Sequence, residues 1–442
     1  MAGRSQVVSV GVERRNARLT SLRKMVPRDA TIVGIDLADD KQALVVSDHD
    51  ARVLDRRMIR GNVWQAIAAL PWAEKVARDA GFARIVLACE PTGNRWKPLL
   101  QHARDSGLEL VCVNPMLVAR GREGEDYTRE RSDYRDGAVI ARLTSERRCF
   151  VPYQPEGAWA RLRHLGIHRF QQLERASAAR QGLRDLLTCY WPTALAAARE
   201  PMTSLTLRAL MSVSADPEEI ARQPLEVLTT RAKPILANWG GRRLNHAILQ
   251  RLHESANQPG GVRAERAAAS ERATLTAHAW LDATTRQRDA EARMVSILDE
   301  LDLARIVRTL PGLSLVGAAT ILAETGDPSR FTHARAWVKH AGLCPRANES
   351  GNYQGQTRTS GRGRPRLRTA AWRVIWGLLP HNHVYAARYT HLRTRARNPL
   401  NDGQARTALA AALLRQLFVM ISTRAAWNPV IAAGKEDLLD AA

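Results

Sequence analysis

The stretch TIVGIDLADDKQALVVSDHDARVLDRRMI (31–59) decides the fold of the N-terminal part of the chain. It holds three short apolar runs with minimal connections, at 31–38, 41–48 and 51–59, which predict an antiparallel meander of three strands. After a predicted helix at 63–81, the runs ARIVLACEP (83–91) and LELVCVNP (108–115) indicate buried strands joined by helical crossovers. Residues 30–150 are therefore predicted to form a mixed α/β domain.

The rest of the chain lacks strand patterns. Residues 151–305 are rich in Ala, Leu, Arg and Glu at helical spacing, and the run 264–307 is long enough for a coiled-coil arm or an antiparallel helical hairpin. Residues 306–426 form a further unit in which glycines punctuate helices. The fold class is α/β plus all-α, with a loose basic arm at 1–29 and a frayed tail at 427–442.

Bulk composition indicates the kind of partner. The 442 residues carry a formal net charge of +22, which points to a polyanion, and nucleic acid is the leading candidate. No uninterrupted apolar run reaches the length of a membrane span, and TALAAALLRQLFVMIS (407–422) contains Arg415 and is typical of a buried helix. The five scattered cysteines favour a reducing, cytoplasmic location.

Four carboxylates occur at positions that suit a metal site. Asp36 lies inside an apolar strand, where an unpartnered charge is costly, and Glu90 ends a second apolar strand. In RSDYRDGAVIARL (131–143), Asp133 and Asp136 are three residues apart at the start of a helix and project from one face. Magnesium prefers oxygen ligands, and two such ions can clamp a phosphodiester. We therefore expect Mg²⁺, or Mn²⁺ in its place.

Each acid also has a structural explanation. Asp133 and Asp136 favour a helix N-terminus, with Ser132 as its cap, while Asp36 suits a basic neighbour and Glu90 a turn. Their joint order, strand acid, strand acid and then a helical D-x-x-D, favours the metal site. Three loop acids without an apolar strand around them are the least suitable ligands: Asp39, Asp40 and Asp126.

The C-terminal part has the charge pattern of a phosphate-binding surface. No Asp or Glu occurs between Ser350 and Asn401, and arginine suits bidentate phosphate contacts. The turn in LPGLSLVGAATILAE (310–324) either offers backbone N–H groups to a phosphate or is a plain helical hairpin. The candidate nucleic-acid-binding residues are Gly312, Gly317, Arg358, Arg362, Arg364, Arg366 and Arg368.

Several hydroxyls lie within ANESGNYQGQTRTSGRG (347–363). A serine nucleophile needs a metal or a base for its proton and cations for the charge that develops on phosphorus. This arginine-rich loop offers that setting to Ser350, Tyr353 and Ser360. The chemistry alone does not choose among them.

The chain resembles the DEDD transposases of bacterial insertion sequences, which are related to the Piv-type DNA invertases and associated with bridge-RNA-guided recombination. The matching pieces begin with GIDLA, EPTG, VNP and RSDYRDGAVIARL, and continue with LPGLSLVGAATILAETGDPSRF, AGLCPRANESG and GRGRPRLRTA. They occur in the family's order at both ends of the chain. The long middle resembles the family only in being helical.

The resemblance implies an RNase H-like (RuvC-like) fold for residues 30–150 and a C-terminal serine transposase domain. The family's metal ligands fall on Asp36, Glu90, Asp133 and Asp136, and its nucleophilic serine on Ser350, with Ser360 as the fallback because the second family motif is altered here. It further implies a covalent phosphoserine–DNA intermediate, a site composed from subunits of a dimer or tetramer, a guide RNA and a nucleoid-associated location.

Two other interpretations remain open at this point. The first keeps the carboxylates and discards the serine, giving a metal-dependent junction nuclease that uses water as its nucleophile. The second keeps only the basic surface, giving a non-catalytic nucleic-acid-binding protein. Neither interpretation requires a protein–DNA adduct.

Overall fold

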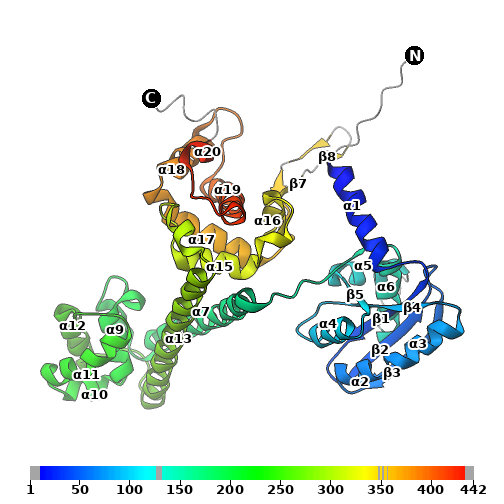
Figure 1. Cartoon of the computed structure of the whole chain (residues 1–442). Helices are drawn as coiled ribbons and strands as arrows, with labels where there is room; N and C mark the ends of the chain where they lie inside the picture. The colour runs from blue at the N-terminus through cyan, green and yellow to red at the C-terminus, as the bar shows by residue number, and fades with distance from the viewer. Residues whose placement is uncertain (1–9, 126–131, 347–348, 351–352, 356, 434–442) are drawn as a thin grey trace. The chain divides into compact units, whose positions relative to one another are not determined.

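The computed structural model describes residues 10–125, 132–346, 349–350, 353–355 and 357–433 (Figure 1). The chain divides into two compact units, 1–154 and 155–442, which are described separately below. The first nine residues of the predicted arm and the 434–442 part of the predicted tail lie outside the described residues.

The first unit is built on a six-stranded mixed sheet with the order β3-β2-β1-β4-β5-β6. Strands β1, β2 and β3 pair antiparallel, which confirms the predicted meander, whereas β1–β4 and β4–β5 are parallel, which confirms the predicted crossovers. The strands are β1 (Ala30–Leu37), β2 (Lys41–Ser47), β3 (Val53–Arg60), β4 (Arg84–Cys89), β5 (Glu109–Val113) and β6 (Cys149–Phe150).

Successive residues of the central strands point to opposite faces of the sheet, and the apolar residues on both faces are buried. Helices therefore cover both faces. Val33 and Ile35 belong to a core with helices α2 (Val63–Ala68), α3 (Leu70–Asp79) and α4 (Trp96–Asp105). Ile32 belongs to a second core with α1 (Val10–Met25), α5 (Pro115–Glu125) and α6 (Asp133–Ser145).

Two local expectations are wrong. The single helix predicted over 63–81 is two helices, since Pro71 lies in the first turn of α3, where its missing N–H is tolerated. The predicted arm is not loose over Val10–Met25, which is helical, because Leu22 and Val26 are buried in the second core.

Two long helices organise the second unit. Helix α7 (Gly157–Tyr190) and helix α13 (Arg266–Glu300) lie side by side in Figure 1. Arg161 pairs with Glu300 and Arg169 with Glu291, each with an N–O distance of 2.7 Å, so the helices run antiparallel. Of the two arrangements predicted for the run 264–307, the chain adopts an antiparallel pairing, although its partner is α7 rather than a neighbouring segment.

A helical subdomain is inserted between these two helices. Its core includes Trp191, Trp239 and Trp280, of which the last two pack edge to face at 5.1 Å between ring centroids. Its elements are α8 (Pro192–Ala196), the 3₁₀ helix η1 (Pro201–Thr203), α9 (Leu205–Val213), α10 (Pro217–Arg222), α11 (Leu225–Asn238) and α12 (His246–Asn257).

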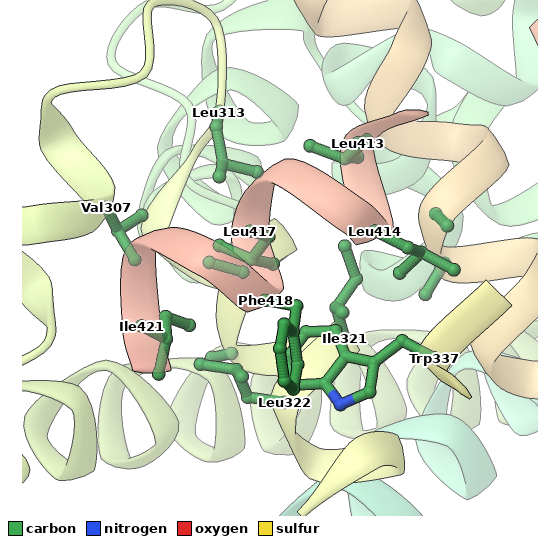
Figure 2. Close-up of a cluster of buried hydrophobic side chains, with 14 of the residues drawn as sticks. Val307, Leu313, Ile321, Leu322, Trp337, Leu413, Leu414, Leu417, Phe418 and Ile421 are labelled. Carbon is green, nitrogen blue, oxygen red and sulfur yellow. The ribbon is translucent and has the colours of Figure 1, made fainter. Parts of the chain in front are cut away.

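The C-terminal part packs around helix α19 (Asp402–Thr423), as Figure 2 shows. This helix is long and apolar enough to cross a membrane, but 61% of its most apolar window is buried, as in the core helix of a globular protein. The other helices of this part are α14 (Ala304–Arg308), α15 (Leu315–Thr325), the 3₁₀ helix η2 (Pro328–Arg330), α16 (Ala334–His340), α17 (Pro365–His381), α18 (His383–Thr394) and α20 (Pro429–Ala433).

Four two-residue strands connect α16 with α17. Strand β7 (Pro345–Arg346) pairs antiparallel with β10 (Arg358–Thr359). Between them, β8 (Glu349–Ser350) pairs antiparallel with β9 (Tyr353–Gln354). The candidate nucleophile Ser350 therefore lies in a small hairpin rather than in a helix.

Candidate functional site

Two of the predicted metal ligands lie at the same edge of the sheet. Asp36 is the penultimate residue of β1, and Glu90 directly follows β4. The two strands are parallel, with Ile35 opposite Cys89 in the register, so Asp36 and Glu90 occupy the next position on each strand. The carboxyl ends of neighbouring parallel strands are where open sheets present functional side chains.

Helix α6 brings the other two acids to β1 through a close glycine contact. A Cβ added to Gly34 would lie 2.0 Å from the carbonyl oxygen of Gly137, so a side chain at this strand position cannot be accommodated without moving the helix. Because Gly34 is two residues before Asp36, the first turn of α6, with Asp133 and Asp136, lies beside the acidic strand end.

The four acids interact electrostatically. Burial, and after it the carboxylates of Asp136 and Asp133, raise the pKa of Asp36 to about 6. The pKa of Glu90 is also raised, by burial and then by Asp36 and Asp136. The helix acids are therefore close enough to disfavour the charged forms of the strand acids.

Two cations that the sequence analysis missed offset part of this repulsion. Lys41 Nζ lies 2.5 Å from Asp133 Oδ2, and Arg122 Nη1 lies 2.9 Å from Asp136 Oδ2. Lys41 begins the strand that follows the Asp36 hairpin, so strand pairing contained a signal for its position. Arg122 lies on α5, and nothing in the local sequence identified it.

The structural explanation for the helix acids is weaker than expected. Ser132 occupies the N-cap position of α6, but its side chain makes no capping hydrogen bond. Among the acids judged unsuitable as ligands, Asp39 is exposed and pairs with Arg95, and Asp40 is exposed. Asp126 lies outside the described residues.

The donor set suits a hard divalent cation. Four carboxylates supply the oxygen ligands that Mg²⁺ prefers, and their charge exceeds that of Lys41 and Arg122. In the described part of the chain, no three His, Cys, Asp or Glu side chains are gathered closely enough to hold a metal. Because Asp133 and Asp136 each contact a cation here, metal binding requires these side chains to exchange partners.

The candidate nucleophiles differ in their surroundings. Strands β8 and β9 contain Ser350 and Tyr353, whose side chains lie outside the described part. The Ser360 hydroxyl donates to the Gly342 carbonyl at 3.2 Å and accepts from Cys344 Sγ at 3.3 Å. Ser360 therefore has a structural role in joining the start and the end of the β7–β10 segment.

The candidate arginines fall into two groups. Arg358 and Arg362 are exposed. Three others make contacts within the unit: Arg364 with Glu324, Arg366 with the Phe170 ring, and Arg368 with the carbonyls of Ala341 and Gly361. A phosphate-binding role stays a prediction for all five.

Glu324 is a charged residue that the sequence analysis did not single out. Its side chain is only 7% exposed, and its Oε2 lies 2.6 Å from Arg163 Nη1 and 3.2 Å from Arg364 Nη1. Arg364 is the N-cap residue of α17, directly after the loop that contains Ser350. This triad of Arg163, Glu324 and Arg364 thus fixes the end of that loop against α15 and α7.

The two candidate glycines of the 310–324 turn pack against α17. Gly312 has φ +83°, and a Cβ there would lie 2.7 Å from the Gly377 carbonyl oxygen; at Gly317 it would lie 2.9 Å from Val374 Cγ2. The Gly317 N–H donates to Ser314 Oγ at 3.0 Å. These contacts favour the helical-hairpin interpretation, and a phosphate contact at this turn stays a prediction.

Sequence comparison gives the class of protein. The family model described as "Transposase IS116/IS110/IS902 family" matches residues 304–390, and a second model, described as a transposase of the IS110 DEDD type, matches residues 33–192. Together they cover more than half of the chain and include all four acids and Ser350. The chain belongs to the IS110/IS116/IS902 family of transposases. The mixed sheet of the first unit is consistent with the RNase H-like fold expected for a DEDD domain.

Two relatives come from insertion elements of Streptomyces. A candidate mini-circle transposase for IS117 of Streptomyces coelicolor is 30% identical over 268 residues, which are 57% of this chain and 62% of the relative. An uncharacterized 44.8 kDa protein of insertion element IS116 of Streptomyces clavuligerus is 27% identical over 354 residues, 77% of this chain and 82% of the relative.

Proposed function

We propose that this chain is a DNA transposase that cuts and rejoins strands at the ends of an insertion element. The observation that carries the proposal is the placement of the helix acids Asp133 and Asp136 beside the strand acid Asp36, where burial and then these two carboxylates raise the pKa of Asp36 to about 6. Carboxylates with raised pKa values cluster at functional sites. Family membership and the basic second unit support DNA as the substrate.

In this proposal the four acids hold Mg²⁺, for which Mn²⁺ can substitute. The bound ion supplies charge stabilisation for a phosphodiester whose bonds are changing. Lys41 and Arg122 hold Asp133 and Asp136 near the strand acids while the site is empty of DNA. When the acids turn to a metal, both cations become available to a phosphate oxygen.

The nucleophile in this proposal is Ser350. Its Oγ loses a proton and bonds to phosphorus, the bond from phosphorus to one deoxyribose oxygen breaks, and that oxygen leaves as a hydroxyl after gaining a proton. Attack by another deoxyribose hydroxyl reverses the step and frees the serine. The phosphoserine conserves the energy of the broken bond, so rejoining needs no further co-reactant.

Further parts of the proposal rest on the family resemblance. They are kinship with the Piv-type invertases, a bridge RNA that pairs with DNA, a dimer or tetramer in which the acids and Ser350 come from different subunits, and a nucleoid-associated location. The strong positive charge of the chain suits an RNA as well as a DNA partner.

Covalent trapping tests the proposal. The protein is incubated with junction DNA of the element, the candidate RNA and Mg²⁺, and a denaturation-resistant adduct is mapped by mass spectrometry. We expect an adduct on Ser350 that is lost in Ser350→Ala and kept in Ser360→Ala and Tyr353→Phe. An adduct that persists in Ser350→Ala would show that another residue is the nucleophile.

The second candidate function is a metal-dependent junction nuclease. The acid cluster favours this function, because a metal held by carboxylates can activate water for hydrolysis without a serine. The same experiment separates the two functions, because the nuclease cleaves DNA and leaves no adduct. Binding with neither cleavage nor adduct in the presence of the RNA and Mg²⁺ would instead indicate a non-catalytic binding protein.

A further inference from the structure

One side of helix α17 presents a stripe of cationic and aromatic side chains. Arg366, Thr369, Arg373 and Trp376 are spaced by three or four residues, which places them on one face of the helix. Thr369, Arg373 and Trp376 are exposed, and Arg366 is half-buried. The stripe lies within the acid-free segment that follows Ser350, so it has no carboxylate of its own.

Trp376 is held in place although much of its ring is exposed. Its side chain is 52% exposed. Trp372 packs edge-on against it at 5.6 Å between centroids, and Arg406 of α19 lies 3.6 Å from the ring centroid. The cation–π contact with Arg406 restrains the indole ring. Such a fixed, exposed ring is a preformed surface for a flat ligand.

A cavity lies beside the stripe within the same unit. Its volume is about 340 Å³, near the lower end of small-ligand pockets. Most of its wall is apolar, including Leu173, Val316 and Val374, and Arg373 of the stripe lines it as well. Arg366 also lines it and is stacked on Phe170, with its Cζ 4.0 Å from the ring centroid.

The charge at the cavity is positive. Among the described residues that line the cavity, Glu324 is the one carboxylate, and it is already paired with Arg163 and Arg364. Arg366 and Arg373 are therefore not neutralised by Glu324. An anionic ligand with an apolar, flat portion fits this combination of walls and charges.

We propose that the α17 stripe and its cavity bind an unpaired segment of nucleic acid. One base stacks on Trp376, a neighbouring base enters the cavity, and the phosphates contact Arg366 and Arg373. The proposal deepens the proposed function and rests on it, because it assumes that the chain acts on nucleic acid. An intact duplex keeps its base faces inside the helix, so a stacking ring selects single strands.

A second copy of this chain is the competing occupant of the stripe, since tryptophan is common at the centre of protein interfaces. In a two-fold contact the same patch would face itself. Arg366 and Arg373 of one copy would then approach those of the other, and like charges across an interface are unfavourable. Charge therefore favours nucleic acid over self-association.

Fluorescence anisotropy of the full chain tests the proposal with four probes of about 12 nucleotides, a length within the usual site sizes. The probes are single-stranded DNA, single-stranded RNA and the matching duplex of each. The variants are Trp376→Ala, Trp376→Phe and Arg373→Gln. The matched controls are Trp64→Ala, a 58% exposed tryptophan of the other unit, and Arg272→Gln, an exposed arginine of α13.

Trp376→Ala should weaken single-strand binding about tenfold, because stacking on one aromatic ring contributes about 1–3 kcal/mol per base. Trp376→Phe should weaken it less than about threefold, and duplex binding should stay within about twofold. The DNA and RNA arms show which strand is preferred. Arg373→Gln should weaken single-strand binding and reduce its salt dependence, and neither control should do so.

Equal loss for single strands and duplexes, or no loss in Trp376→Ala, would overturn the proposal. A shift in oligomeric state with unchanged binding, measured by light scattering, would assign the stripe to self-association instead. If Trp376→Ala does not fold, the Trp376→Phe and Arg373→Gln results decide. Adduct formation on duplex junction DNA by the wild type reports the proposed function separately, so either idea can fail alone.

Discussion

Asp36 is the residue at which burial and function conflict most directly. Its strand position is dictated by the apolar residues on either side, and its carboxylate is disfavoured there by burial and by two neighbouring acids. The sequence analysis predicted Asp36, Glu90, Asp133 and Asp136 from strand and helix spacing. It did not predict Lys41 and Arg122, because those contacts depend on tertiary packing between separate elements.

Asp36→Asn should stabilise the first unit in a pH-dependent way. The pKa of Asp36 is about 6 in the folded chain and 3.8 in the unfolded one, so its contribution to folding is favourable below the unfolded pKa and is lost as the pH rises through 6. The asparagine variant should gain about 1 kcal/mol at pH 8, after allowance for partial exposure. Thermal unfolding in EDTA measures the gain, which should shrink towards pH 4. A gain independent of pH would contradict the electrostatic cause.

Glu324→Gln should destabilise the second unit by about 3 kcal/mol, because it leaves the cations of Arg163 and Arg364 without their shared carboxylate. The matched control is Glu300→Gln, which breaks the ion pair between Arg161 and the 47% exposed Glu300 and should cost less than about 1 kcal/mol. Urea unfolding followed by circular dichroism compares the two variants. Equal effects would show that burial of the triad is unimportant.

At the scale of elements, hydrophobic periodicity predicted the strands and helices themselves better than it predicted which of them pack together. The alternation in β1–β3 and the apolar runs of β4 and β5 specified the strands and their directions. The same reasoning did not identify α7 as the partner of α13, because 75 residues separate the end of one from the start of the other. Nor did it explain Gly34, whose role is visible only when Gly137 lies against it.

Gly34→Ala should displace α6 from β1, because the added Cβ would meet a backbone carbonyl that cannot move independently of its helix. We expect a loss of stability of at least about 2 kcal/mol and weaker stabilisation by Mg²⁺. The control Gly124→Ala lies on α5, where no atom of the described residues lies within 4 Å of the added Cβ, and it should be neutral or stabilising by up to about 1 kcal/mol. Equal stability of Gly34→Ala and the wild type would contradict the close approach.

At the scale of the whole molecule, the chain consists of two units with separate cores. The loss of strand patterns near residue 150 predicted a boundary there, and the sequence analysis predicted a further boundary between residues 305 and 306 inside the second unit. The proposed function combines acids of one unit with a serine of the other, and such a combination depends on contacts between units or subunits. Local patterns contain no information on such contacts, which is why the composite site came from the family resemblance.

The two units should unfold in two separable thermal transitions, because domains with their own cores behave as cooperative units. Scanning calorimetry of the full chain should show one transition that moves up with Asp36→Asn in EDTA and also with Mg²⁺, because in the proposed function this ion binds the acid cluster only when the first unit is folded. The other transition should move down with Glu324→Gln and be insensitive to Mg²⁺. If Mg²⁺ raises both transitions equally, the metal stabilises contacts that link the units, and the acids of the first unit are then not its only site. If a single transition responds to both substitutions, the two cores unfold together and the inter-unit contacts are strong.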